Sequence, residues 1–221
     1  MAVWLSYSLS DFLLFSPRTY YRLFELTNLA LWPLHLLAAT LGLLLVVLLH
    51  GRQPWRGRVI AAVLALIWAW VAWAYLLERY ATINWAASYF AIGFAVQAAL
   101  LALSGIGANR FKPAADPLSR SGRALVVFAL VIQPLAAPLC GRALTQLEFF
   151  GIAPDPTVTA TIGVLLALPR VPWLLLVIPL LWCAITGLTL WAMEAPDALV
   201  MPAVAVFALA VAAGKSWKRC A

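Results

Sequence analysis

Long apolar runs, separated by short charged or proline-rich breaks, make up most of this chain of 221 residues. A helix that crosses a lipid bilayer needs about 20 predominantly apolar residues, and most of the runs have about this length. Soluble domains contain about 25% charged residues, whereas this chain contains 10% charged and 65% hydrophobic residues. The chain is therefore predicted to be an all-α, polytopic membrane helix bundle with almost no chain left for a domain outside the membrane.

Seven transmembrane helices are predicted, and they form a bundle over residues 27–214. An N-terminal interfacial segment, residues 1–26, precedes the bundle, and a basic cytoplasmic tail, residues 215–221, follows it. The seven spans have the approximate bounds Thr27–Leu49, Val59–Leu77, Trp85–Ile106, Ala124–Leu144, Pro156–Leu168, Pro172–Trp191 and Ala198–Gly214.

The N-terminal segment is predicted to lie in the membrane interface and not to be a secretory signal. No basic region precedes its short apolar run, and no small-residue cleavage site follows that run. Ser16 and Pro17 are typical of a helix start, with Ser16 as N-cap and Pro17 as the first helical residue. Tyr20, Tyr21 and Phe24 then alternate with charged residues, which is the composition of a helix lying along the bilayer surface.

Basic residues are concentrated in alternate breaks, and this pattern predicts the orientation. Eleven of the 15 Lys and Arg residues follow spans one, three, five and seven, and the positive-inside rule assigns that side to the cytoplasm. Of the eight acidic residues, only Asp116 falls on the same side. We therefore expect the N-terminus outside and the C-terminus inside. The eleven basic residues are Arg52, Arg56, Arg58, Arg110, Lys112, Arg120, Arg123, Arg170, Lys215, Lys218 and Arg219.

The fifth predicted span is too short for a bilayer of ordinary thickness. At 1.5 Å per residue, the run from Pro156 to Leu168 covers about 20 Å, against a hydrocarbon core of about 30 Å. Asp155 is expected to be its N-cap, with Pro156 at the first helical position. A full crossing would require local membrane thinning. A re-entrant helix is the alternative, which leaves six spans and places the C-terminus outside.

Three polar residues fall inside predicted spans, and they define a candidate polar pocket. His35 lies in the first span, Gln97 in the third and Gln133 in the fourth. Pro134 follows Gln133, and a proline leaves a carbonyl one turn earlier that must find another partner in a membrane. The three side chains are interpreted either as a polar pocket or as separate hydrogen bonds that hold helices together.

Ten charged residues near the predicted outer helix ends define a candidate periplasmic interaction rim. Ion pairs that cap helix ends, a docking surface for another subunit and a vestibule that collects cations are all open interpretations. No acidic residue is predicted deep in a span, which argues against a proton-coupled pump. The ten residues are Arg18, Arg22, Glu25, Glu78, Arg79, Arg142, Glu148, Asp155, Glu194 and Asp197.

Aromatic residues are predicted to anchor the protein in the membrane. Most of the 11 Trp residues, Trp68 among them, fall near the predicted interfaces, where indole rings prefer to lie. Trp70 and Trp73 share one helical face, and a flat apolar ligand such as a quinone or a pigment could stack there.

No cofactor, metal site or catalytic group is predicted. His35 and His50 lie about 22 Å apart along one helix and cannot share a metal ion or a haem. The three cysteines form no C-x-x-C motif and have no histidine at the spacing of metal ligands: Cys140, Cys183 and Cys220. No G-x-S-x-G, Walker or H-E-x-x-H motif occurs. The basic breaks are interpreted as topology signals and contacts with anionic lipids, and nucleic acid is not expected as a partner.

Four sequence strings resemble a domain-of-unknown-function family of small polytopic bacterial inner-membrane proteins, whose members are sometimes labelled permeases. The strings are Ser16 to Glu25, Glu78 to Trp85, Phe150 to Thr157, and Trp191 to Ala198. The resemblance implies a multi-pass protein of the bacterial inner membrane and supplies no catalytic or binding residues. All four strings fall on the predicted outer face, which suggests that this face is the working surface.

Two functions follow as hypotheses. The first is an accessory or assembly subunit of a larger membrane complex, which docks other membrane subunits, or copies of itself, through the periplasmic face. The second is a small-solute or ion permease with its path near His35, Gln97 and Gln133. No inverted repeat divides the chain into two halves, as many transporter folds require, so the subunit hypothesis is preferred. An enzyme is not favoured.

Overall fold

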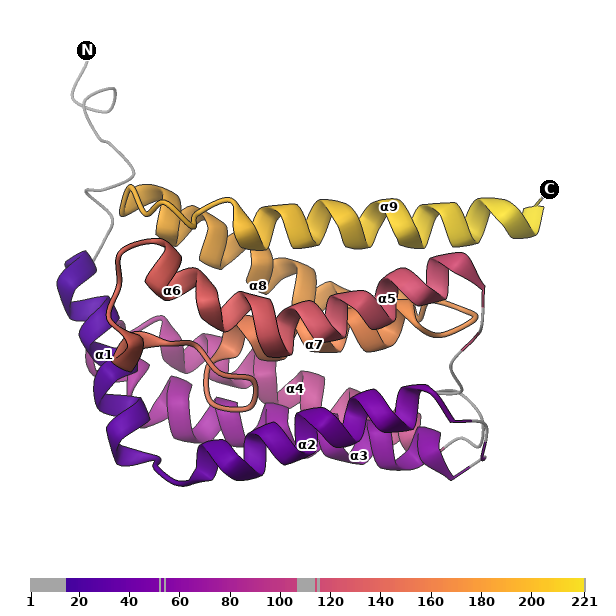
Figure 1. Cartoon of the computed structure of the whole chain (residues 1–221), viewed down its shortest axis with the longest axis horizontal. Coiled ribbons are helices and arrows are strands. Elements are labelled where there is room, and N and C mark those ends of the chain that lie inside the picture. The colour runs from indigo at the N-terminus through magenta and orange to yellow at the C-terminus, as the bar shows by residue number, and fades with distance from the viewer. Residues whose placement is uncertain (1–14, 52, 54, 107–113, 115, 221) are drawn as a thin grey trace, which may run out of the picture.

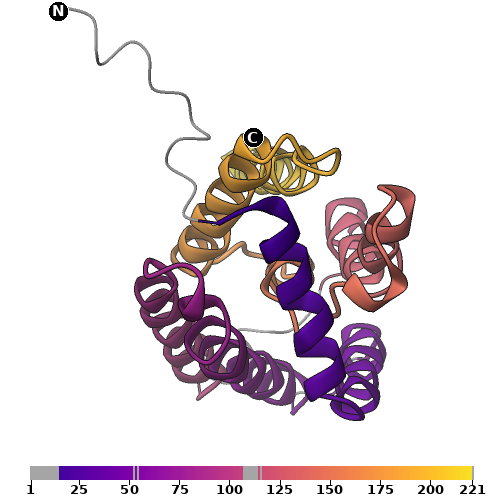
Figure 2. The same ribbon diagram turned by 90° about the vertical axis from the view of Figure 1, so that its left-hand side faces the viewer.

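The computed structural model describes residues 15–51, 53, 55–106, 114 and 116–220, without the side chains of residues 218–220. Most of the N-terminal segment, with Asp11, and the basic residues Arg52, Arg110 and Lys112 therefore lie outside the described residues. The described chain is all-helical and forms a bundle whose helices run back and forth along one axis, while α1 lies across one end (Figures 1 and 2). We call this end the α1 end and the opposite end the Lys215 end.

Helix α1, Pro17–Ala30, begins as the sequence predicts. Ser16 is its N-cap and accepts a hydrogen bond from the Thr19 amide at 3.2 Å. The chain then bends by 93° before α2, Leu34–Leu49. The predicted first span therefore starts too early, because the residues from Thr27 to Ala30 belong to the crossing helix α1.

Five helices are long and apolar enough to cross a membrane, and the bent pair α1–α2 would be a sixth, counted over the described residues. The first of the five is α3 (Arg56–Val71), which continues through a π-helical segment, 72–77. Another is α5 (Pro117–Val127), which continues through π and 3-10 turns into α6 (Ala136–Leu139). The remaining three are α4 (Ala87–Ile106), α8 (Trp173–Ala192) and α9 (Val200–Cys220).

The predicted fourth span, Ala124–Leu144, is displaced along the chain. Its helix begins at Pro117 because Asp116 is an N-cap, whose carboxylate accepts a hydrogen bond from the Ser119 amide at 3.0 Å. It ends at Leu139 because the chain reverses at Gly141, whose φ is 75°. A glycine adopts this left-handed conformation without the steric cost of a side chain.

Helix α7, Pro154–Leu166, occupies the centre of the bundle, and all 13 of its residues are buried. Figure 2 shows it surrounded by the other helices and crossed by α1. It begins near Asp197, which precedes α9, and it ends beside Lys215, near the end of α9. Helix α7 therefore lies beside α9, with its start near the segment before α9 and its end near Lys215.

Both ends of α7 are held by buried polar groups. Asp155 lies in the first turn and not at the N-cap, which is Ala153, so the predicted cap is wrong by two residues. At the other end, Lys215 Nζ donates hydrogen bonds to the carbonyls of Leu166 and Leu168, at 2.7 and 2.6 Å. A negative charge at the start of a helix and a positive charge at its end both complement the helix dipole.

Helices α5 and α7 touch through glycines. A Cβ on Gly122 would lie 2.5 Å from the Ala167 nitrogen, and a Cβ on Gly163 would lie 2.7 Å from the Gly122 oxygen. Small residues allow helix backbones to approach closely inside a membrane bundle. Trp68 of α3 adds a hydrogen bond from its indole nitrogen to Thr161 at 2.8 Å and is fully buried, so it is not part of the predicted aromatic belt.

Candidate functional site

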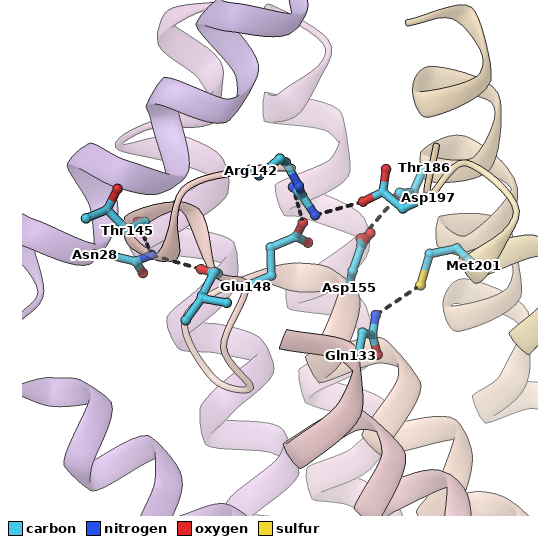
Figure 3. Close-up of polar contacts among 10 residues, drawn as sticks. Asn28, Gln133, Arg142, Thr145, Glu148, Asp155, Thr186, Asp197 and Met201 are labelled. Atoms are coloured by element: carbon cyan, nitrogen blue, oxygen red, sulfur yellow. Dashed lines mark hydrogen bonds and ion pairs between the residues drawn. The ribbon is translucent and has the colours of Figure 1, made fainter. Parts of the chain in front are cut away.

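A buried charge cluster of four residues lies at the α1 end, near the start of α7. It consists of Arg142, Glu148, Asp155 and Asp197 (Figure 3). Arg142 comes from the turn that follows α6, Glu148 from the connection to α7, Asp155 from α7 itself, and Asp197 from the connection between α8 and α9. Four separate segments therefore meet here.

Arg142 joins two of the carboxylates. Its Nη1 lies 3.0 Å from Glu148 Oε1, and its Nη2 lies 2.7 Å from Asp197 Oδ2. The side chains of Arg142 and Asp197 are each 7% exposed, and that of Glu148 is 13% exposed. The turn at Gly141 sets this geometry, because it directs the Arg142 amide back to the Ala137 carbonyl at 2.8 Å. The guanidinium group then points into the bundle.

Asp155 receives hydrogen bonds from α8. Its Oδ1 accepts one from the Trp182 indole nitrogen at 2.7 Å and one from the Thr186 hydroxyl at 3.1 Å. The preceding turn is closed by Gly151, with a φ of 74°, whose amide donates to the Thr157 hydroxyl at 2.9 Å. Two donors and the N-terminus of α7 stabilise this carboxylate in its charged form.

Helix α1 covers the cluster. The Tyr21 ring centroid lies 4.7 Å from the Arg142 guanidinium carbon, which is a cation–π contact. Asn28 donates hydrogen bonds to the Thr145 and Leu147 carbonyls at 2.9 and 2.8 Å. Glu148 follows Leu147 directly, so α1 holds the segment that carries Glu148 in place.

The cluster contains more negative than positive groups. With three carboxylates and one guanidinium, it would carry a net charge of −2 if every group were ionised, which is costly in a buried site. Burial, together with the neighbouring Asp155, raises the pKa of Glu148 from 4.5 to about 8, and Arg142 opposes this rise. Burial and the nearby carboxylate therefore favour the protonated form of Glu148 over its charged form.

A cavity of about 20 Å³ lies within the cluster, and Gln133 and Met201 also line it. Three buried polar atoms of lining residues have no hydrogen-bond partner: Gln133 Oε1, Arg142 Nε and Asp197 Oδ1. Gln133 uses its amide nitrogen for a contact with the Met201 sulfur at 3.5 Å.

The structure divides the predicted rim into two sets. Four of its residues form the buried cluster and do not lie on an exposed surface, and among them Arg142 makes ion pairs with two carboxylates: Arg142, Glu148, Asp155 and Asp197. Arg18, Glu78 and Glu194 are exposed, Arg22 and Glu25 form a partly exposed ion pair, and Arg79 donates to the Ala74 carbonyl.

The predicted polar pocket is not assembled. His35 bonds to Asn28 at 3.0 Å, and Gln97 donates to the Leu175 carbonyl of α8 at 2.9 Å. Gln133 alone reaches the charge cluster. The hydrogen bond of Gln97 joins α4 to α8, so its geometry matches the interpretation that this side chain holds two helices together.

Other candidate ligands remain dispersed. Among the described residues, no three His, Cys, Asp or Glu side chains are placed to hold a metal ion. His50 bonds to the Val46 carbonyl at 2.8 Å, and Cys140 and Cys183 are free thiols. Trp70 lines an apolar groove of about 350 Å³ between α2 and α3, and its ring lies 5.5 Å from that of Trp73.

The described residues form an all-helical structure in which apolar helices, five of them long and apolar enough to cross a membrane, pack around a buried central helix. The chain belongs to DUF6064, a family of unknown function, which matches residues 18–220. No curated protein and no solved structure matches the chain. The family match agrees with the resemblance to a family of unknown function, and it assigns no activity to the charge cluster.

Proposed function

We propose that this protein is an accessory or assembly subunit of a larger complex in the bacterial inner membrane, and that it docks its partner through the α1 end. The α1 end then faces the periplasm, as the basic residues of the chain predict. The observation that carries the proposal is the rigid attachment of α1 across the end of a bundle whose centre is filled.

The buried face of α1 holds the helix firmly. Tyr20, Leu23, Phe24 and Thr27 are buried, and the Phe24 ring stacks on the Tyr75 ring with 5.6 Å between centroids. The contacts of Tyr21 with Arg142 and of Asn28 with the connection to α7 attach α1 at two further points.

The opposite face of α1 presents a surface that is already ordered. Arg18 and Arg22 are exposed, as are Leu26 and Leu29, at 49% and 64%. Arginine is enriched in protein interfaces, and a surface that is already ordered loses less conformational entropy on binding. This mixed apolar and basic face suits a membrane subunit that packs beside and over the α1 end.

The filled centre disfavours the permease alternative. Helix α7 is buried along its whole length, and its backbone contacts that of α5 at Gly122 and Gly163. One observation supports the alternative, since Gln133 lies at a polar cavity. That cavity holds about 20 Å³, enough for one water molecule, and His35 and Gln97 do not extend it.

Extraction in a mild detergent followed by native mass measurement tests the proposal. We expect a complex of defined mass and stoichiometry that contains a second protein. Arg18→Glu with Arg22→Glu should dissociate it, whereas the matched change Arg120→Glu, at an exposed position of α5 near the Lys215 end, should leave it intact. A lone chain or homo-oligomer that shows solute or proton flux in proteoliposomes would replace this proposal with the permease.

A further inference from the structure

We propose that the buried charge cluster is a proton-binding site, in which Glu148 carries the proton and one internal water molecule fills the adjoining cavity. The proposal is independent of the docking function, because it concerns buried groups that no partner needs to touch.

The three unpartnered atoms are complementary to one water molecule. Gln133 Oε1 and Asp197 Oδ1 are acceptors, and Arg142 Nε is a donor. A water molecule has two protons to donate and accepts hydrogen bonds as well, so it can satisfy all three groups at once. Gln133 is 7% exposed and Asp197 is 8% exposed, so bulk solvent does not satisfy them. A cavity of about 20 Å³ is above the 10–15 Å³ that one water requires.

The contacts of each carboxylate identify the proton carrier. Asp155 accepts two hydrogen bonds and lies at the N-terminus of α7. Asp197 has the shorter contact with Arg142, 2.7 Å, and would receive a second hydrogen bond from the water. Glu148 has one contact in the structure, at 3.0 Å to Arg142. Its charged form is therefore the least stabilised of the three.

The groups around Glu148 favour uptake of a proton. Its charged neighbours are Arg142, Asp155 and Asp197. Three tyrosines of α1 and of the π-helical end of α3 are also close enough to interact with it electrostatically: Tyr20, Tyr21 and Tyr75. Phenols are neutral at physiological pH, so they add no charge. One proton on Glu148 lowers the net charge of the four residues from −2 to −1 and leaves one carboxylate, Asp197, paired with Arg142. The burial that raises the pKa of Glu148 acts in the same direction.

An infrared pH titration of the purified full chain in detergent tests the proton. We expect the carbonyl band of one protonated carboxylic acid at neutral pH, lost with a midpoint near the Glu148 pKa of about 8. The band should be absent in Glu148→Gln and unchanged in the matched variant Glu78→Gln, at an exposed position of the α1 end. No band in the wild type, or an unchanged band in Glu148→Gln, would overturn the assignment.

An experimental structure at a resolution that shows ordered water tests the second part. We expect density for one water within hydrogen-bond distance of Gln133, Arg142 and Asp197. In Gln133→Leu the density should be lost while the helices stay in place. An empty cavity in the wild-type protein would refute the internal water, and a stronger peak with metal coordination distances would refute the proton site in favour of a cation.

Discussion

Arg142 and Asp197 form a buried ion pair across 55 positions of the chain, with 2.7 Å between Nη2 and Oδ2. The pair links the turn after α6 to the connection between α8 and α9, and so it ties the middle of the sequence to its C-terminal helices. Tyr21 stacks on the same guanidinium group, so Arg142 also holds α1.

Replacement of Arg142 should destabilise the fold strongly. Arg142→Met leaves Asp197 buried without its cation, and breaking a buried pair in this way costs about 3–5 kcal/mol. Arg22→Met is the matched control, because the Arg22 side chain is 56% exposed in its ion pair and such pairs contribute about 0–1 kcal/mol. Unfolding in mixed detergent micelles measures both. Adding Asp197→Asn to Arg142→Met should recover part of the lost stability. An equal loss of stability in Arg142→Met and Arg22→Met would contradict the buried pair.

Stability should fall as the pH rises through the range in which Glu148 ionises. The folded-state pKa of about 8 lies above the ordinary 4.5, so between these values the folded state binds more protons than the unfolded state. The free energy of unfolding therefore decreases with rising pH in this window. Unfolding curves of wild type and Glu148→Gln at pH 5 and pH 8 measure the effect, and the slope should be smaller in Glu148→Gln. Parallel slopes would exclude Glu148 as the titrating group.

Gly122→Ala should separate α5 from α7. The new methyl group would meet the backbone of Ala167, Gly163 and Leu166 at 2.5–2.7 Å, and backbone cannot rotate away as a side chain can. Overpacking of this kind costs about 1–3 kcal/mol. Gly93→Ala in α4 is the control, since a Cβ there meets nothing within 4 Å and alanine is favoured over glycine in a helix by about 0.5–1 kcal/mol. The two variants should therefore change the free energy of unfolding in opposite directions.

Lys215→Met should loosen the end of α7. It removes three hydrogen bonds, to Ser119 Oγ and to the Leu166 and Leu168 carbonyls, and buried groups left unsatisfied cost about 1–3 kcal/mol each. Hydrogen exchange of the last turn of α7 is the direct measurement, and we expect faster exchange there than at its first turn. Arg170→Met, at an exposed position of the same end, should leave the exchange unchanged.

Orientation can be tested with two introduced cysteines in a chain whose three native cysteines are replaced by alanine. Arg18→Cys lies on α1 and Arg170→Cys lies at the Lys215 end, and both positions are exposed. An impermeant maleimide should label the first in spheroplasts and the second only after the membrane is opened. The reverse result would invert the orientation that the basic residues predict.

Sequence patterns predicted the helices well because local chemistry determines them. Hydropathy located five long apolar helices, and Ser16 with Pro17 marked the start of α1. The same reasoning placed the bend before Thr27 and not after Ala30, because a continuous apolar run spans it.

The burial of the charge cluster could not be predicted in the same way. Arg142, Asp155 and Asp197 each lie near a helix end, where charged residues are ordinarily solvated, and only the packing of distant segments encloses them. One overlooked signal was the composition of α7. Its small and β-branched residues around Thr157, Thr159 and Thr161 show no polar face, and a helix that is apolar all round is typically buried.

The central position of α7 has a consequence for how the protein is made. At about 20 Å, this helix is too short to partition into a bilayer of about 30 Å by itself, so it requires neighbours before it can leave the insertion machinery. The group that caps its end, Lys215, lies in α9 and is therefore synthesised after α7 and α8. A chain truncated after Ala192 should therefore leave α7 open to protease, in contrast to the full chain. The contacts that enclose the innermost helix therefore form only after α8 and α9 have been synthesised.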